Sequence, residues 1–301
     1  MPHQHSHSGP GQLDRRLWAS AALNLVITII EFAGGLWAGS LALLADAAHN
    51  LADVGALGLA IFARHLGRRP PTLRHTYGFR RAEVVAALAN AAVLIAISAL
   101  IGREAVARLI EPEPVHASVM LVAAAVAFVA NLVSVALLHR HQAEDINVRS
   151  AFLHLAQDAL ASLAVLVAAL LARTAIGPYV DPLAAVLIGI VVLRSAFGIV
   201  WESLNTLLEA APADIDIERL ADEVAQRFSG ARLHHVHVWE VGPGQRALTA
   251  HMKVSVTGLA DAENLAAEVR EFLHERWGIV HATLETEVNG CGKEGLLGDW
   301  H

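Results

Sequence analysis

Six stretches of mainly apolar residues recur along the first two-thirds of the chain, and each comes close to the roughly 20 residues that a helix needs to cross a bilayer. They cover residues 17–37, 41–63, 84–101, 115–138, 151–172 and 180–200. The third is short by itself, but a helix there is expected to extend through Arg103 to Leu109. The first is too long for the core of a signal peptide, so we expect it to stay in the mature protein. The pattern predicts a membrane all-α bundle of six helices over residues 15–209.

The composition changes at residues 209–212. After this point apolar and polar residues alternate with the periods typical of helices and strands in soluble proteins. This pattern predicts a helix over 214–228, strands over 233–241 and 247–256 joined by a turn at 242–244, a helix over 261–277 and a strand over 282–288. We interpret this α-β-β-α-β order as a ferredoxin-like α+β domain over residues 210–290. Residues 1–14 and 291–301 are expected to form an amino-terminal and a carboxyl-terminal tail.

Two local features of this second part carry predictions of their own. Asp214 and Asp261 are the expected N-caps of its two helices, because a short acidic side chain can accept a hydrogen bond from the first turn. Strict alternation in the first strand places His235 and His237 on one face and His234 on the other.

Arginines in the short connections set the expected orientation in the membrane. Ten arginines lie on one side of the membrane, either before the first stretch, between the second and third stretches, or between the fourth and fifth stretches. They are Arg15, Arg16, Arg64, Arg68, Arg69, Arg74, Arg80, Arg81, Arg140 and Arg149. The opposite side has only Arg103, Arg108 and Arg173. We therefore expect a multi-pass protein of the cell (inner) membrane, with both termini cytoplasmic.

Composition and charge narrow the function classes. The chain is 55% hydrophobic and 17% charged, against roughly 45–50% and about 25% for soluble domains, so an ordinary water-soluble enzyme is disfavoured. The formal net charge of −7 arises entirely after Ala210, and an acidic part disfavours nucleic acid as a partner. The single cysteine, Cys291, excludes an internal disulfide and a cysteine-only zinc site. Seventeen histidines leave imidazole and carboxylate as the groups available for site chemistry.

The most informative residues are ionisable ones inside the apolar stretches, because a charge at the bilayer centre costs at least about 2.5–3.5 kcal/mol. The second stretch contains His49 and Asp53, and the fifth contains His154 and Asp158. A four-residue spacing places each pair on one helix face. Two such helices side by side would form a two-His, two-Asp tetrahedral cage that suits zinc.

The alternative is that these side chains are hydrogen-bonding residues that join helices. Two pairs at one spacing in two segments favour the metal cage. Asp46, one turn before His49, is either a proton or ion relay or a capping and packing residue. Further polar residues are expected to line the same interior, mainly through structural hydrogen bonds: Asn24, Glu31, Asn90, Asn131 and Gln157.

Several motifs together resemble the cation diffusion facilitator family of metal exporters. They are Gly39-Ser40 followed by Leu-Leu-Ala-Asp46-Ala-Ala-His49 with Asp53, the loop His75-Thr-Tyr-Gly78-Phe-Arg-Arg-Ala-Glu83, and His154 with Asp158. The resemblance covers nearly the whole chain after the first dozen residues. It implies export of a divalent cation from the cytoplasm in exchange for protons by a homodimer, and histidine at position 49 implies a preference for zinc.

The resemblance also implies further metal sites. Some members of the family bind a metal through three residues of the loop after the second stretch. Here only His75 matches one of these ligands, and Thr72 and Phe79 stand at the other two positions. We therefore expect no metal in this loop and expect His75 to be a hydrogen-bonded loop residue. In the soluble part, His234, His251 and Glu287 match positions that bind regulatory zinc, and His235 or His237 either replaces or joins His234. The alternative for this set is surface and cross-strand polar residues.

Other matches bear on the dimer and the tails. Arg81 and Glu209 match a charged interlock of the family, with a screened surface pair as the alternative. The tail histidines His3, His5 and His7 are candidates for capturing zinc, and Cys291 is a candidate ligand.

Imidazole chemistry supports exchange of metal for protons, because a histidine must be neutral to bind metal and protonation ejects the ion. No Walker-type phosphate loop occurs in the sequence, and no organic cofactor is expected. Two other functions use the same ligands: a membrane metalloenzyme, which would keep an open coordination position, and a membrane-anchored metal sensor.

Overall fold

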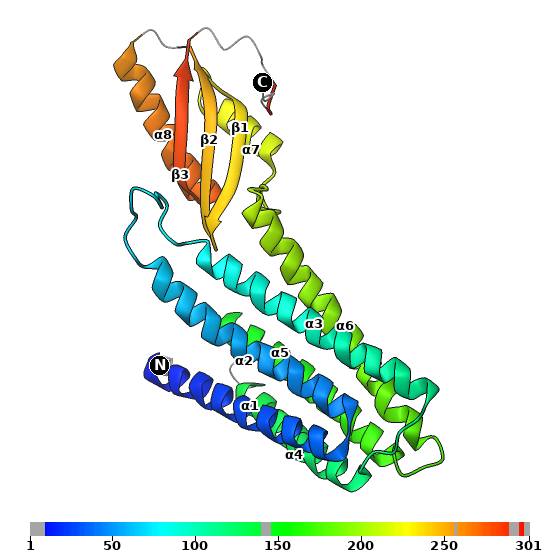
Figure 1. Ribbon diagram of the computed structural model, residues 1–301. Helices are drawn as coiled ribbons and strands as arrows, with labels where there is room; N and C mark the ends of the chain where they lie inside the picture. The colour runs from blue at the N-terminus through cyan, green and yellow to red at the C-terminus, as the bar shows by residue number, and fades with distance from the viewer. Residues whose placement is uncertain (1–9, 140–145, 256–257, 289–294, 298–301) are drawn as a thin grey trace. The chain divides into compact units, whose positions relative to one another are not determined.

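The computed structural model describes residues 10–139, 146–255, 258–288 and 295–297. Six long helices come first in the chain and a small α/β part follows (Figure 1). The helices are α1 (Pro10–Ala38), α2 (Leu41–Gly67), α3 (Ala82–Ile110), α4 (Ala117–His139), α5 (Ile146–Leu171) and α6 (Gly177–Leu207). Each contains most of one predicted apolar stretch.

Four helices of the described residues are long and apolar enough to cross a membrane: α3, residues Ala117–Ala136 of α4, Phe152–Leu171 of α5, and α6. In α1 the described apolar part, Ala22–Ala38, is shorter than a full span. The second helix is long, but Asp46, His49 and Asp53 interrupt its apolar sequence. The predicted number of six helices agrees with the structure, whereas length and composition identify four of them as spans.

Packing divides the chain into two units, each described by itself: Met1–Gly58 with Ala89–Gly198, and Leu59–Leu88 with Ile199–His301. In the first unit, glycines let the helices approach closely. A Cβ atom on Gly34 would lie 2.7 Å from the Ala123 side chain of α4, and one on Gly35 would lie 2.9 Å from Leu44 of α2. Small residues therefore hold α1 directly against α2 and α4.

The first turn of α2 is capped by a side chain from a distant helix. Asp181 near the start of α6 is fully buried, and its carboxylate accepts hydrogen bonds from the Ser40 hydroxyl (2.5 Å) and the amides of Leu41 (2.8 Å) and Ala42 (3.2 Å). Free amides at a helix start carry partial positive charge, so a buried carboxylate is well placed there. This contact fixes the start of α2 against α6.

The second unit contains α7 (Ile217–Arg227), β1 (Ala231–Gly242), β2 (Gln245–Val254), α8 (Leu259–Trp277) and β3 (Ile279–Glu287). The predicted α-β-β-α-β order is confirmed. The sheet has the order β1-β2-β3, with β1 antiparallel and β3 parallel to β2. The described residues thus form a three-stranded mixed sheet, and the predicted ferredoxin-like arrangement of it stays a prediction. Both helices pack on its apolar face over a core that includes Leu220, Val236, Leu248, Met252 and Leu273.

Both predicted N-caps are wrong. The cap of α7 is Asp216, which accepts a hydrogen bond from the Arg219 amide three residues later, as capping geometry requires. Asp214 instead binds the Arg246 guanidinium at 2.6 Å. The cap of α8 is Gly258, and Asp261 lies in the first turn of the helix, where its charge still complements the helix dipole.

The predicted strict alternation of β1 is interrupted at its histidines. The register with β2 shifts between His234 and His237, and His235 has a left-handed φ of 48°. Such a bulge places two residues opposite one and redirects side chains. His234 and His235 are therefore not separated by the sheet, and their rings lie 5.1 Å apart.

Candidate metal centre

The four residues predicted to form a cage meet between α2 and α5. His49 and Asp53 lie one turn apart on α2, and His154 and Asp158 lie one turn apart on α5. The His49 Nε2 atom lies 3.7 Å from both the Asp53 and the Asp158 carboxylate. The His154 Nε2 atom lies 3.4 Å from Asp53 and 3.8 Å from Asp158.

Each of these four distances exceeds the normal length of a hydrogen bond, so the imidazole nitrogens and the carboxylate oxygens surround a gap instead of bonding to one another. The two imidazole rings stand edge to face with centroids 6.3 Å apart. Ligand atoms of His49, Asp53 and Asp158 all lie within 4.8 Å of one another. His154 stands at the rim, with 42% of its side chain exposed. Three of the four residues are therefore close enough to share one divalent ion, with His154 beside them.

Buried oxygens without donors support this interpretation. Asp158 is almost fully buried, yet neither of its carboxylate oxygens has a hydrogen-bond partner among the described residues, and Asp53 Oδ2 has none either. Leaving a buried charge without a partner is costly, so a cation is the natural partner for this site.

Polar residues surround the cage on the buried side. Asn131 of α4 donates to the Ser162 hydroxyl (3.0 Å), which donates to Asp46 (3.1 Å). Asn50 donates to Glu31 of α1 at 2.8 Å. Glu31 and Asn131 lie in the interior as expected, whereas Ser162 and Asn50 were not predicted to do so.

The remaining interior predictions have mixed outcomes. Asn90 donates to the Ala52 carbonyl (3.1 Å), and Asn24 is buried. Gln157 is exposed, so its predicted interior position is wrong. It precedes Asp158, and one residue rotates a helix position by about 100°, away from the cage.

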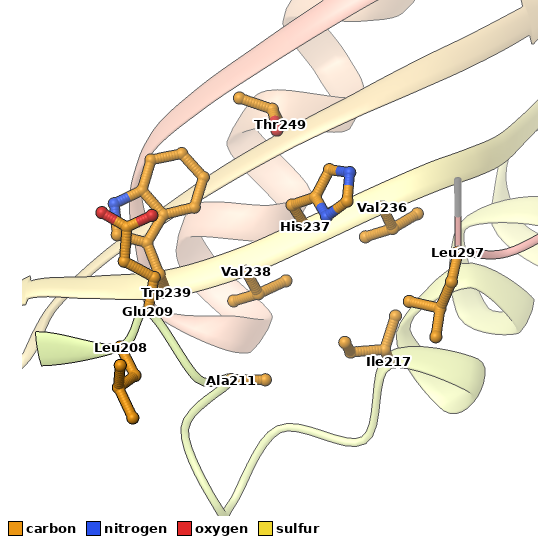
Figure 2. A pocket seen from close by; sticks show the side chains of 10 residues that line it. All are labelled: Leu208, Glu209, Ala211, Ile217, Val236, His237, Val238, Trp239, Thr249 and Leu297. Atoms are coloured by element: carbon orange, nitrogen blue, oxygen red, sulfur yellow. The ribbon is translucent and has the colours of Figure 1, made fainter. Parts of the chain in front are cut away.

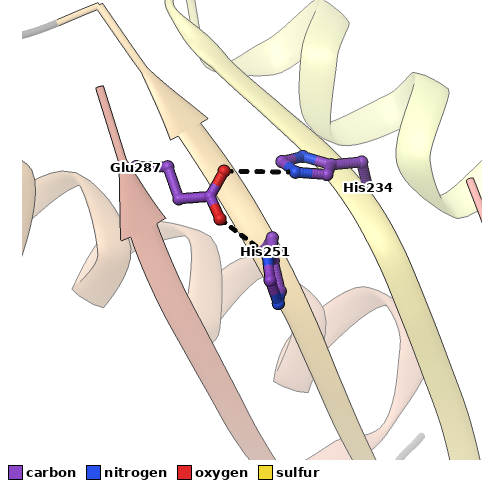
Figure 3. A group of neighbouring side chains, drawn as sticks. All are labelled: His234, His251 and Glu287. Carbon is purple, nitrogen blue, oxygen red and sulfur yellow. Dashed lines mark hydrogen bonds and ion pairs between the residues drawn. The ribbon is translucent and has the colours of Figure 1, made fainter. Parts of the chain in front are cut away.

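A second group of possible ligands lies on the sheet, in the second unit (Figure 3). Its members come from three adjacent strands: His234 from β1, His251 from β2 and Glu287 from β3. The Glu287 carboxylate lies 3.2 Å from His234 Nε2 and 2.6 Å from His251 Nδ1. Burial lowers the pKa of His234, although the nearby charge of Glu287 acts in the opposite direction. The lowered pKa favours the neutral form of the imidazole, which is the form that binds metal.

The bulge in β1 decides how the neighbouring histidines relate to this group. The His235 ring lies 5.0 Å from the His251 ring, next to the group, but His235 is not one of the three residues whose ligand atoms converge. His237 instead lines a separate surface pocket of 560 Å³ with Trp239 and Thr249 (Figure 2). Glu285, which the sequence analysis did not single out, lies 3.6 Å from His251 Nε2.

Arg81 and Glu209, two further predicted residues, form an ion pair. Arg81 Nη2 lies 2.8 Å from Glu209 Oε1, with side chains 35% and 60% exposed. In the loop before α3, the His75 amide donates to the Thr72 hydroxyl, and its ring packs on Phe79 at 4.5 Å. His3, His5, His7 and Cys291 lie outside the described residues.

Sequence reasoning missed two features of the molecule. Asp181 was not identified, although an aspartate near the start of an apolar stretch is the kind of residue that should have raised the question of its partner. The proximity of Glu31 to Asp46 was also missed: Asn50, one turn after Asp46, donates to Glu31 of α1, and no spacing rule connects residues on different helices.

Comparisons with known proteins identify the family. The chain matches the cation efflux transmembrane domain over residues 17–208 and the cytoplasmic domain of cation efflux proteins over residues 212–288. It is 37% identical to the zinc transporter ZitB of Escherichia coli, over all of this chain and 99% of that one. It is 33% identical to the metal cation efflux system protein CzcD of Cupriavidus metallidurans, over 95% and 90% of the two chains.

A third relative carries a name that specifies an exchange. The cadmium, cobalt and zinc/H(+)-K(+) antiporter of Bacillus velezensis is 31% identical over 96% of this chain and 92% of that one. Matches of this extent cover both parts of the molecule. The chain therefore belongs to the cation efflux family, also called cation diffusion facilitators, whose members are multi-pass membrane transporters and not enzymes.

Proposed function

We propose that the protein exports divalent cations, zinc above all, from the cytoplasm in exchange for protons, and that His49, Asp53, His154 and Asp158 hold the ion during transport. The observation that carries this proposal is the convergence of two imidazoles and two donor-free carboxylates between α2 and α5. The names of the E. coli and B. velezensis relatives, a zinc transporter and a zinc/H(+)-K(+) antiporter, support the same cargo and exchange.

The ligand set explains why protons are the counter-ion. An imidazole binds metal only when neutral, and its ordinary pKa of about 6.5 lies close to physiological pH. Zinc loading therefore releases protons, and protonation of His49 or His154 from the far side weakens the site. The exposed position of His154 at the rim gives protons a route to one ligand.

Zinc also cancels the charge that the cage would otherwise carry. Asp53 and Asp158 contribute two negative charges, and one Zn²⁺ neutralises both. A neutral loaded site costs less to enclose in a medium of low dielectric constant than a doubly charged empty one. Alternation between inward-open and outward-open states then needs no nucleotide.

The four-ligand cage disfavours a metalloenzyme, because catalytic zinc normally keeps three protein ligands and an open position for water. A membrane-anchored sensor is disfavoured because this cage is built from residues of the apolar helices α2 and α5.

The topology belongs to the proposal as well. We place six membrane spans at α1–α6, in a membrane domain of residues 15–209, with both termini on the cytoplasmic side of the cell membrane. Residues 210–290 form the cytoplasmic metal-binding domain, and the match to the cytoplasmic domain of cation efflux proteins supports a homodimer.

His234, His251 and Glu287 are proposed to bind a regulatory zinc ion. Two imidazole nitrogens and a carboxylate, with His235 and Glu285 alongside, are a suitable donor set for zinc. The neutral state favoured for His234 is the one that coordinates metal.

Flux measurements on purified full-length protein in proteoliposomes test the proposed transport. An opposed pH gradient should drive zinc movement, and His49→Ala or Asp158→Ala should reduce the flux at least about 100-fold, since losing even an outer-sphere partner costs 10–100-fold in metal affinity. Gln157→Ala, at the exposed neighbouring position, is the matched control and should keep wild-type flux. Wild-type flux in His49→Ala would contradict the proposed site, and no proton dependence would contradict the exchange.

A further inference from the structure

Two buried carboxylic acids outside the four-ligand cage lie next to each other in the helical unit. Glu31 of α1 and Asp46 of α2 are both fully buried, and Asn50, one turn after Asp46 on α2, donates to Glu31 at 2.8 Å, which brings the two acids to the same place between the helices. Among the described residues, neither forms an ion pair with an arginine, lysine or histidine within 4.0 Å. The pair therefore has no fixed positive charge to balance it.

The hydrogen-bond donors around this pair are too few for two carboxylates. Asn50 donates to Glu31 Oε2, and Ser162 donates to Asp46 Oδ2. The other oxygen of each acid, Glu31 Oε1 and Asp46 Oδ1, is buried without a partner in the described part of the chain, as is the Asn50 amide oxygen. Two adjacent carboxylates in a low-dielectric interior repel each other strongly unless a nearby cation offsets their charge, so a shared proton is favoured while the cage is empty.

The surroundings of the pair suit a proton better than a metal. Its partners are an amide and a hydroxyl, and none of the described residues brings an imidazole into hydrogen-bonding contact with it, whereas zinc prefers nitrogen and sulfur ligands. The titratable groups that act on it through space are Asp158 of α5, on both acids, and His49 of α2, on Asp46. The pair is thus distinct from the cage but senses its charge.

We propose that Glu31 and Asp46 together form a proton-binding site of the transporter, separate from the metal ligands, whose occupancy changes with that of the cage. This inference rests on the proposed zinc–proton exchange. When Zn²⁺ enters the cage, its charge favours release of the shared proton to water, which leaves both acids as carboxylates. When Zn²⁺ leaves, a proton returns to a carboxylate oxygen of the pair and offsets the negative charge of Asp53 and Asp158.

The test counts protons released per zinc ion bound by the purified full-length protein, in weakly buffered detergent solution with a pH indicator. Glu31→Gln and Asp46→Asn should each release about one proton fewer than the wild type while still binding zinc at the cage. The control is Asp181→Asn, which alters an acid that is equally buried but already accepts three hydrogen bonds, and it should keep the wild-type proton count.

A measurement on the wild type complements the variants. Zinc binding should remove a protonated-carboxyl band from the infrared difference spectrum, and Glu31→Gln should lack this change. An unchanged proton count in both variants, or no carboxyl band in the wild type, would overturn the proposal. Absence of zinc binding by the wild type would instead contradict the proposed function, so the two failures are distinguishable.

Discussion

At the scale of single residues, the buried acids of the helical unit are compensated in three different ways. Asp181 is surrounded by donors from the start of α2. Asp53 and Asp158 have oxygens without donors and face two imidazoles, which is the arrangement expected for a cation. Glu31 and Asp46 lie against each other, as expected for a shared proton. Each arrangement reduces the free-energy cost of burying a charged carboxylate. Only the two arrangements at Asp53–Asp158 and at Glu31–Asp46 leave room for an ion that is transported.

Asp181→Ala should destabilise the helical unit, because it leaves the Ser40 hydroxyl and two buried amides without an acceptor. A buried group that loses its partner costs about 1–3 kcal/mol, so we expect at least that loss. Thermal unfolding in detergent and hydrogen exchange in the first turn of α2 measure it. Asp181→Asn keeps one acceptor oxygen and should lose less. Equal unfolding midpoints for Asp181→Ala and the wild type would refute the proposed role as a cap.

His235→Gly should stabilise the metal-free protein, because the left-handed conformation of His235 costs roughly 1 kcal/mol with a side chain and nothing with glycine. Unfolding is measured after zinc is removed with a chelator. His237→Gly, in the same strand without a positive φ, should destabilise instead. The account of the bulge is wrong if both glycine variants lose stability equally. With zinc restored, His235→Gly should bind it more weakly if the imidazole is a ligand.

At the scale of secondary structure, periodicity predicted which segments are helices and strands but not how they end or bend. A four-residue spacing is local, so the pairing of His49 with Asp53 and of His154 with Asp158 was visible in the sequence. The caps at Asp216 and Gly258 depend on which of several nearby residues reaches the first turn. The β1 bulge depends on pairing with β2, and the Glu31–Asp46 contact depends on helix packing, so neither has a local signal.

The contact between α7 and α8 gives a pH-dependent prediction. Glu223 of α7 accepts hydrogen bonds from Arg219 (3.0 Å) and from Arg276 of α8 (3.2 Å). Desolvation opposes the shift, but these arginines hold the pKa of Glu223 below its ordinary value of 4.5. A lowered pKa means that the charged form stabilises the fold above about pH 4.5 and that this contribution is lost as the pH falls further.

Glu223→Gln should therefore reduce hydrogen-exchange protection of α7 near neutral pH. The difference from the wild type should shrink when the pH is lowered below about 4, after correction for intrinsic exchange rates. A difference that stays constant with pH would show that the carboxylate charge does not hold α7 against α8.

At the scale of the whole molecule, composition already separated an apolar helical part from an acidic one, and the two family matches meet between residues 208 and 212. The net charge of −7 arises in the second part, where an acidic surface favours divalent cations. The excess of histidine resolves into a cage between two helices and a cluster across three strands. Which imidazoles belong to the sheet cluster could not be read from the sequence, because the β1 bulge redirects them.

The Arg81–Glu209 ion pair gives a prediction about the charged interlock. Because both side chains are partly exposed, a double-mutant cycle with Arg81→Gln and Glu209→Gln should give a coupling energy of at most about 1 kcal/mol that decreases with added salt. Dimer dissociation and zinc flux are the two readouts. A larger coupling that is insensitive to salt would instead support an interlock that controls the dimer.

The most direct test of the central claim is a zinc-bound structure with anomalous diffraction recorded at the zinc absorption edge. The account predicts a peak between α2 and α5, about 2.0–2.2 Å from nitrogen or oxygen atoms of His49, Asp53, His154 and Asp158. A second peak is expected at His234, His251 and Glu287. Zinc bound elsewhere in the helical unit, with no peak at the four-residue cage, would contradict the account.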